Sequence, residues 1–522
     1  MGGNKVVNFL RKYMMLIAMV VVVIIFYNLT DGRSLLPQNV NNVISQNAYV
    51  FVLGTGMLLC ILTGGNIDLS VGSVVCLAGG VGAILMDKNI PWPVAVIAML
   101  VMGLLVGMWH GYWIAYVKVP PFIATLVGML AFRGLANIIM KGLAYSLYQE
   151  KPNQAAFLKI FGGGDSCYIP GSYIPDKIAH MRAGFINQQI TGSYTTDLNL
   201  IQQTINKLQG IADAGQEAQE VIKAAEAAKQ TVPEYLAATG TTLSDASQQI
   251  FADAAAAGKD VPAYLAAIGK TLTDLKIYVS SQLNVTCLVV GILIAVGFVV
   301  FTIWNRKRLI KKGYKVDSLA TVIIKTTLIF AVILWLTYKF AGYKGIPTVL
   351  IWIAIVLGLF AYITSKTTLG RNLYAVGGNE KATRLSGINT KKVMFSAYTL
   401  MGVLAGFAGV LNIARQMGSQ PTYGAGYEMD AIAACFIGGA SAYGGTGSIG
   451  GVIIGAALCG IINQGMVIAK TPTNYQTVVK GLVLLVAVLF DVIMQMRRKG
   501  AKKVKKASAT QASATEKGGA NA

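Results

Sequence analysis

The chain has 522 residues, of which 54% are hydrophobic and only 13% are charged, whereas soluble domains carry about 25% charged residues. This composition excludes an ordinary soluble protein and predicts an all-α polytopic membrane protein. Lys and Arg outnumber Asp and Glu by 44 to 22. The excess lies in loops between apolar runs and in the tail, which is typical of cytoplasmic loops of membrane proteins and argues against nucleic-acid binding.

Apolar runs long enough to cross a bilayer, about 20 residues as a helix, recur in both halves of the chain. The first run follows Lys5, Arg11 and Lys12 and lacks a small-x-small cleavage site, so we expect a retained helix rather than a signal peptide. We expect eleven or twelve spans, near residues 13–28, 43–63, 70–87, 93–117, 119–141, 284–304, 319–340, 346–364, 393–413, 447–469 and 476–495, with a weaker one at 428–444. The N-terminal transmembrane helices thus occupy residues 1–149 and the C-terminal ones residues 284–498.

The stretch TGGNIDLSVGS, residues 63–73, separates the second and third expected spans. Its two glycines break the second span, and Asn66, Asp68 and Ser70 are suited to cap the start of the third. Non-helical backbone at membrane depth is tolerated only where it is buried in protein or lines a cavity. The stretch is therefore either part of a translocation path or a capped helical hairpin in which Asp68 is a cap and no more.

Residues 150–283 interrupt the apolar pattern with a segment rich in Ala, Gln, Asp, Thr and Gly. It contains a near-repeat, VPEYLAATGTTLSD at 232–245 and VPAYLAAIGKTLTD at 261–274, offset by 29 residues. A capping box at Thr231 and glycines at 240 and 269 predict short helices. We expect an extracytoplasmic helical insert, either a small cap over the outer mouth or a tolerated surface insertion. Cys167 in the insert and Cys287 after it are candidates for a disulfide.

Three strongly basic segments, residues 305–315, 365–392 and 497–506, are expected to be cytoplasmic. The second and third segments lie on the same side of the membrane only if an even number of spans separates them. Counting 428–444 as a span places four spans between them. This favours twelve spans with both termini in the cytoplasm. The tail, residues 499–522, begins with basic residues, continues as an Ala/Ser/Thr-rich sequence and is expected to be disordered.

The loop GGNEKATRLSGIN, residues 377–389, is polar and long enough to hold structure of its own. Residues 380–385 are expected to form a short helix, with Asn379 as its N-cap and Gly387 as its stop. Such a helix could dock into a groove of a partner, or the segment could be an ordinary solvated loop.

Glu428 and Asp430 open a run of small residues, Ala, Gly and Ser, that continues to residue 451. Small residues allow helix backbones to approach closely, which suits either a pore wall or helix packing without any ligand contact.

The sequence lacks the common motifs of enzymes. It contains no GxxxxGK[ST], HExxH or GxSxG sequence, no CxxC or Cys/His metal spacing, and only two histidines. We therefore expect no catalytic residues, no metal and no cofactor, and a transport module rather than an enzyme.

Four motifs, GNIDLSVGS (65–73), PPFIATLVGMLAFRG (120–134), GRNLYAVGGNEKATRLSGIN (370–389) and EMDAIAACFIGGASAYGGTGSIGG (428–451), resemble the permeases of bacterial ATP-binding-cassette importers for monosaccharides. The extra pair of spans around 305–315, followed by YKGIPTVL, is most similar to the xylose and multiple-monosaccharide permeases, with ribose and galactose permeases more distant. The long insert departs from the family pattern.

The resemblance implies a permease that dimerises with a second copy, binds a cytoplasmic ATP-binding subunit and receives sugar from an extracytoplasmic sugar-binding protein. It assigns the ATPase-coupling loop to Gly378, Asn379, Glu380, Ala382, Arg384 and Gly387. It also makes Asn66, Asp68, Ser70, Glu428 and Asp430 candidates for the translocation path.

The substrate expected from the resemblance is a monosaccharide of the xylose, galactose, arabinose or glucose type, crossing the cytoplasmic membrane of a bacterium. The alternative is a secondary sugar carrier driven by an ion gradient, which would need ionisable groups inside the membrane. Few such groups lie deep in the expected spans.

Overall fold

The computed structural model describes residues 18–30, 32–163, 167–169, 173–175, 242–243, 277–278, 282–314, 316, 318–489 and 492. The chain divides into two compact units. Unit 1 comprises residues 1–169 and 346–522, and unit 2 comprises residues 170–345.

Helices dominate the described chain and confirm the all-α polytopic class. Seven are long and apolar enough to cross a membrane. They are α5 with the π-helical turn η2 (Trp92–Val117), α6 (Pro121–Met140), α14 (Val285–Lys311), α15 (Leu319–Ala341), α16 (Thr348–Lys366), α19 (Thr390–Gln416) and α21 (Ile449–Ile468).

Further apolar helices lie at the other expected spans. The helices α2 (Pro37–Gln46) and α3 (Ala48–Leu62) are together long and apolar enough for a span, and they meet at a bend of 40°. Three shorter helices are Ala18–Leu29, α4 (Val71–Asp87) and Thr473–Leu489. Each of the eleven stronger spans expected from the sequence therefore has a helix at its position.

The weaker span near 428–444 contains only the short helix α20 (Tyr427–Ile437). Its 11 residues rise about 16 Å, which is less than the roughly 30 Å hydrocarbon core. The remainder of the segment is irregular backbone. Before α20, the strand β6 (Gly418–Ser419) pairs with β1 (Tyr145–Ser146). After α20, the loop 438–447 reaches the opposite end of unit 1, where Gly445 N donates to Leu62 O at 3.2 Å. The longer stretch of residues 418–445 thus passes between the two ends, with α20 as its only described α-helix.

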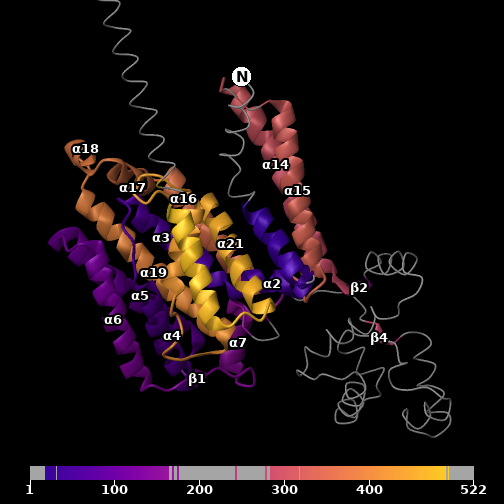
Figure 1. Ribbon diagram of the computed structural model, residues 1–522, viewed down its shortest axis with the longest axis horizontal. Helices are drawn as coiled ribbons and strands as arrows, with labels where there is room; N and C mark the ends of the chain where they lie inside the picture. Colours follow the sequence, from indigo (N-terminus) through magenta and orange to yellow (C-terminus); the bar gives the residue numbers. More distant parts are fainter. Residues whose placement is uncertain are drawn as a thin grey trace, which may run out of the picture. The chain divides into compact units, whose positions relative to one another are not determined.

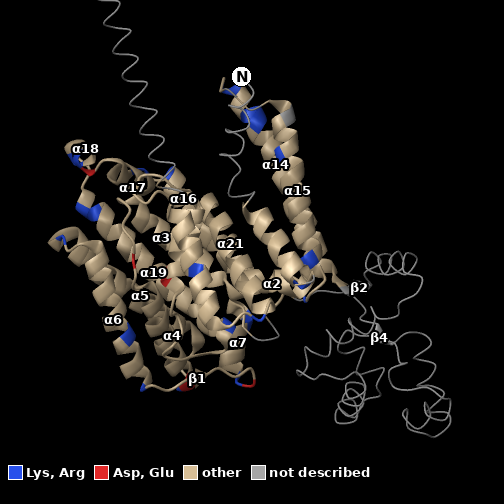
Figure 2. Cartoon of the chain, viewed as in Figure 1, with Lys and Arg blue, Asp and Glu red and all other residues tan. Residues whose placement is uncertain are grey.

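Two ends of unit 1 are distinguished in Figure 1. One, called the α18 end, carries α17 (Thr368–Gly378) and α18 (Glu380–Leu385). The other, called the β1 end, carries β1 and α7 (Pro152–Phe161). Figure 2 shows Lys, Arg and acidic residues around α18, whereas the ribbon of the central helices is almost entirely uncharged.

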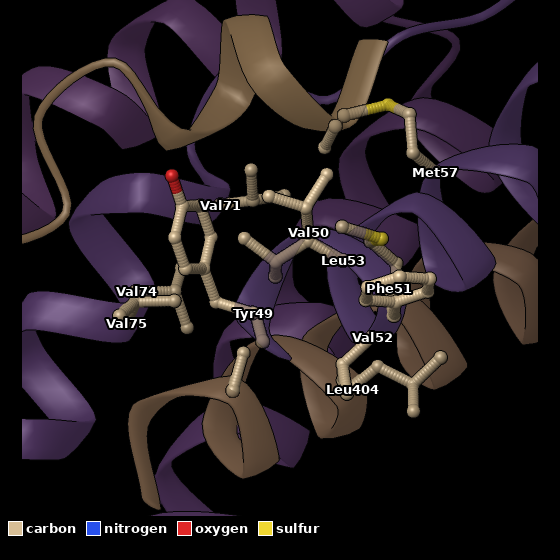
Figure 3. Packing of buried hydrophobic residues seen from close by; sticks show 14 of the residues in the cluster. Tyr49, Val50, Phe51, Val52, Leu53, Met57, Val71, Val74, Val75 and Leu404 are labelled. Carbon is tan, nitrogen blue, oxygen red and sulfur yellow. The ribbon is translucent and has the colours of Figure 1, made fainter. Parts of the chain in front are cut away.

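The helix α3 lies at the centre of unit 1. All 15 of its residues are buried, as expected for a helix that is apolar on every face. Figure 3 shows Tyr49, Val50 and Leu53 of α3 close to Val71, Val74 and Val75 of α4, with Leu404 of α19 in the same cluster. This packing fixes the two ends of α3, on which both polar sites described below depend.

Glycines bring α5 and α19 into close contact. Gly103 and Gly107 of α5 face Gly402 and Gly406 of α19, so that a Cβ added at Gly103 would collide with the Gly402 carbonyl. Each helix therefore presents a small-xxx-small pair to the other, an arrangement that allows membrane helices to pack backbone to backbone.

The helix α7 closes the β1 end. Gln154 donates to Met86 O at 3.2 Å and accepts from Tyr148 N at 2.7 Å, while Asn153 bonds both Trp92 N and Ile90 O at 2.8 Å. These bonds satisfy backbone groups where α4 ends and α5 begins. The part of the expected insert that belongs to unit 1 is thus a docked helix.

Unit 2 contains the helical hairpin α14–α15 and two described strand pairs. The N-cap of α14 is Asn284, which accepts from Cys287 N at 2.9 Å, and Gly291 lies against Thr337 of α15. The strands are β2 (Tyr173–Pro175) paired with β5 (Gln282–Asn284), and β3 (Thr242–Leu243) paired with β4 (Ile277–Tyr278). Cys287 of this unit and Cys167 of unit 1 are both free, buried cysteines.

Most of the predicted insert, including all of the near-repeat except residues 242–243, lies outside the described residues, as does the tail 499–522.

Candidate functional site

The predicted coupling helix is present at the α18 end. The Asn379 side chain accepts from Ala382 N at 3.0 Å, and Gly387, at φ 81°, follows the last turn. The Thr383 hydroxyl donates to Ala375 O and Asn379 O at 2.8 Å, which ties α18 back to α17. The predicted helix, its cap and its stop are therefore confirmed as local structure.

Nearly all of α18 faces outward. Glu380, Ala382 and Arg384 are exposed, and only Thr383 is buried. Leu385 is 88% exposed, which places a large apolar side chain on a solvent-facing polar turn. The sequence analysis did not predict a role for Leu385, although a lone leucine in the polar segment EKATRLSGIN indicates an apolar contact.

A cavity of about 740 Å³ runs beside α18. It joins Glu380, Arg384 and Gly387 with Asn66 of the broken stretch and with Lys118 and Lys391. Three cations and one carboxylate give this cavity a basic lining. The structure thus brings one predicted path residue and three predicted coupling residues to the same surface, called here the α18 groove.

The broken stretch 63–70 lies at this end as a tight hairpin. Gly64 and Gly65 have φ angles of 132° and 78°, values that L side chains rarely adopt. Asp68, only 3% exposed, accepts from Ser70 N at 2.8 Å and from Ser70 Oγ at 2.6 Å through one oxygen. Asn66 donates to Thr63 Oγ1 at 3.1 Å.

These contacts refine the expected capping. The N-cap of α4 is Ser70, but its own side chain makes no capping bond. Asp68 instead fixes the residue that precedes the helix, and Asn66 bonds back to the end of α3. The hairpin is therefore held chiefly by its own neighbours.

The glycine-rich loop 438–447 packs against this hairpin. A Cβ at Gly65 would collide with Ala442 O, and one at Gly377 with Leu62 O. Tyr374 of α17 donates to Gly447 O at 2.8 Å. The three glycine-rich segments of the sequence thus meet at the α18 end, where backbone contact excludes larger residues.

The other two path candidates lie away from this hairpin. Glu428 contacts Gly72 at the start of α4. Asp430, 4% exposed, accepts from Tyr49 OH at 2.6 Å and from Lys480 Nζ at 3.0 Å. Tyr49 is in the first turn of α3, whereas Asp68 N lies against Met57 S, two turns further along. The five path candidates are therefore split between two levels of unit 1.

A second cavity, of about 430 Å³, adjoins Asp430 toward the β1 end. It is called the amide chamber because five of its side chains are amides: Gln46, Asn47, Gln416, Asn463 and Gln476. The aromatic rings of Tyr49 and Tyr427 stack at its wall, with centroids 3.6 Å apart and planes 14° apart. The sequence analysis did not predict this cluster, because its five amides and two tyrosines come from six helices and from the junction between α2 and α3.

The sequence is similar to those of known membrane permeases. A family model described as the permease component of branched-chain amino acid transport systems matches residues 39–166 and 254–488. The chain belongs to this family of membrane permeases. The permease is also 30% identical over 488 residues to the xylose transport system permease protein of Haemophilus influenzae, covering 93% of this chain and 97% of that protein.

Two further relatives have different coverage. The xylose transport system permease protein of Escherichia coli K12 is 30% identical over 495 residues, which is 94% of the permease and 93% of the relative. The ribose import permease protein of the same strain is 49% identical, but over 148 residues, 28% of the permease and 46% of that protein. No solved structure matches the permease.

The family match includes α18, the broken hairpin and Asp430, and omits residues 167–253. Both polar sites therefore lie on the part of the permease that the family shares, whereas much of the insert does not.

Metal binding has no support in the part of the permease that the structure describes, where no group of three or more His, Cys, Asp or Glu side chains could hold an ion.

Proposed function

We propose that the permease is the membrane subunit of an ATP-binding-cassette importer that carries a monosaccharide of the xylose, galactose, arabinose or glucose type. The observation that carries this proposal is the similarity to xylose transport system permeases over 93% and 94% of the chain. A match of this length covers the spans, the coupling segment and the glycine-rich segments together, rather than one shared motif.

The assembly follows from the same proposal. Two copies of the permease dimerise in the cytoplasmic membrane of a bacterium, surrounded by lipid, with both termini in the cytoplasm. The α18 end faces the cytoplasm and binds an ATP-binding subunit. The β1 end faces outward and receives sugar from an extracytoplasmic binding protein.

The exposed turn of α18 supports its role as the coupling contact. Gly378, Asn379 and Gly387 give the helix its limits, and Glu380, Ala382 and Arg384 form its outward surface. Leu385 adds an apolar side chain that no described neighbour covers. Such a side chain is suited to an apolar pocket of a partner, where a buried leucine contributes about 1.5–3 kcal/mol.

The path through unit 1 is proposed to run between the amide chamber and the broken hairpin. Asp430 and Glu428 stand at the outer level, and Asn66, Asp68 and Ser70 at the inner level. The alternative expected from the sequence, an ion-coupled carrier that operates without an ATP-binding partner, is not favoured by the similarity to xylose transport system permeases.

Transport by reconstituted protein separates these mechanisms. The permease, its ATP-binding subunit and its binding protein are placed in proteoliposomes, and entry of radiolabelled xylose is measured. We expect uptake to require ATP and the ATP-binding subunit and to persist with an ionophore. Uptake by the permease alone that collapses with the ionophore would overturn the proposal.

The coupling contact is tested by Leu385→Asp. The matched control is Leu143→Asp, because Leu143 is 58% exposed and lies just before β1, at the opposite end. We expect the first variant to insert and fold normally but to lose ATPase stimulation by loaded binding protein, and the control to retain it. Equal stimulation of both variants would remove α18 from the proposed interface.

A further inference from the structure

The amide chamber has the size of a small-molecule site. Its volume of about 430 Å³ falls within the range of about 300–1,000 Å³ that ligand pockets occupy. It lies where α19 ends, at Gln416, and where α3 begins, at Asn47. Both positions are at the opposite end of these helices from the α18 groove.

The chemistry of the lining matches a polyhydroxylated ligand. A sugar hydroxyl both donates and accepts hydrogen bonds, and each amide side chain offers two donors and an acceptor. Five amides therefore supply both kinds of group from several directions. The stacked tyrosines add a flat apolar face of the kind against which the C–H face of a sugar ring packs.

The charges of the chamber favour a neutral ligand. Lys480 is held to Asp430 at 3.0 Å, so the two charges compensate each other. Arg415 is the other cation of the lining. A site for an anionic sugar would benefit from several uncompensated cations placed for charge-assisted hydrogen bonds, and this lining is instead dominated by amides.

Hydrogen bonds hold the lining in place before any ligand enters. Tyr49 OH donates to Asp430, and Tyr427 OH donates to Asn412 Oδ1 at 2.8 Å. Asn463 donates to Asn47 Oδ1 at 3.1 Å, and Gln476 donates to Thr471 O at 2.8 Å. The Gln476 bond uses only its amide nitrogen and leaves the oxygen as an acceptor. Fixed side chains lower the entropy cost of ligand binding.

We propose that the amide chamber binds a neutral monosaccharide during its passage from the β1 end, an inference that rests on the proposed transport function. Asn463, Gln476 and Gln416 bond the sugar hydroxyls, and Tyr427 packs against the ring. Asp430 does not touch the sugar. It is a positioning residue that holds Tyr49 and Lys480 at the wall and neutralises the lysine.

The first test measures binding of radiolabelled xylose to the full-length permease in nanodiscs. Neutral xylose and its aldonic acid, xylonate, are compared as competitors. We expect unlabelled xylose to displace the label and xylonate to fail. Absence of saturable xylose binding, or displacement only by the acid, would overturn the proposal.

The second test uses Asn463→Leu and Gln476→Leu in the complete reconstituted importer. Loss of hydrogen bonds worth about 1.4 kcal/mol should lower uptake at low xylose by about tenfold. The ATPase activity stimulated by loaded binding protein should persist, because the α18 end is unchanged. Gln149→Leu is the matched control, since Gln149 is an exposed amide beyond β1 and outside the chamber lining.

Failure of the two ideas is distinguishable. If the wild-type complex imports no monosaccharide, the proposed function fails. If the wild type imports xylose and both chamber variants import it with unchanged rate and KM, only the chamber assignment fails. Should either variant fail to fold, Gln416→Leu replaces it, because Gln416 is exposed and its change leaves the core packing intact.

Discussion

Asp68 and Asp430 are both buried carboxylates, but they are stabilised in different ways. Asp68 bonds the backbone and side chain of Ser70, two residues away. Asp430 bonds Tyr49 and Lys480, which lie 381 and 50 residues away. The free-energy cost of burying Asp68 is thus offset by a residue of the same hairpin. The cost of burying Asp430 is offset by side chains from two other helices.

The difference has consequences for function. A hairpin held by its own neighbours can keep its shape while the helices around it shift. The Asp430 cluster instead joins α3, α20 and the helix Thr473–Leu489, so it depends on their mutual placement. A substitution at Asp430 should therefore affect both the stability of the permease and the shape of the amide chamber more than one at Asp68.

The largest stability loss is expected for Asp430→Ala. It leaves the Tyr49 hydroxyl and the Lys480 ammonium without their shared partner. Removing one partner of a buried pair costs about 3–5 kcal/mol, and the loss here should lie near the lower end of that range because the Lys480 side chain is 28% exposed. Unfolding of the purified permease in mixed micelles gives the free energy. Asp430→Asn is the control, because an amide oxygen still accepts from Tyr49, and it should lose less. Equal, small losses for both variants would show that the cluster is not held as described.

A smaller loss, about 2 kcal/mol, is expected for Asp68→Ala, because it removes two short local hydrogen bonds and leaves a buried N–H unpaired. Asp68→Asn keeps the accepting oxygen and should recover most of that loss. The same unfolding measurement applies. If Asp68→Ala were more harmful than Asp430→Ala, the distinction between local and distant stabilisation would be wrong.

Ser70→Ala removes only the hydroxyl bond and leaves the bond from Ser70 N to Asp68. We expect a loss of about 1 kcal/mol, with xylose uptake retained if the hairpin keeps its shape. Loss of uptake without loss of stability would show that the Ser70 hydroxyl contacts the sugar directly, rather than only holding the shape of the hairpin.

The smallest effect is expected for Asp87→Asn. Asp87 pairs with Lys151 at 4.0 Å, and the two side chains are 48% and 44% exposed. Exposed pairs of this kind contribute about 0–1 kcal/mol, so the variant should unfold within about 0.5 kcal/mol of the wild type. A larger loss of unfolding free energy would mean that the exposure of the Asp87–Lys151 pair does not make it weaker than the buried contacts of Asp430.

Local features were predictable because their partners lie within one helical turn. The cap of α18 by Asn379, its stop at Gly387 and the break at Gly64 and Gly65 are fixed by short side chains and by φ angles that suit glycine. The positions of the eleven stronger spans were equally accessible, because a run of apolar residues specifies a helix in lipid without reference to its neighbours.

Composition and hydrophobic pattern by themselves determined that this protein is a helical membrane protein with a short capped helix in a basic loop, and its four motifs added the resemblance to sugar permeases. Tertiary structure alone decided which polar residues meet. Asn47, Gln416, Tyr427, Asn463 and Gln476 are scattered over 430 positions, from 47 to 476, and each reads alone as an ordinary residue near a helix end. They form one chamber because α3 is buried on every face and fixes the helices around it, a packing outcome that no local spacing encodes.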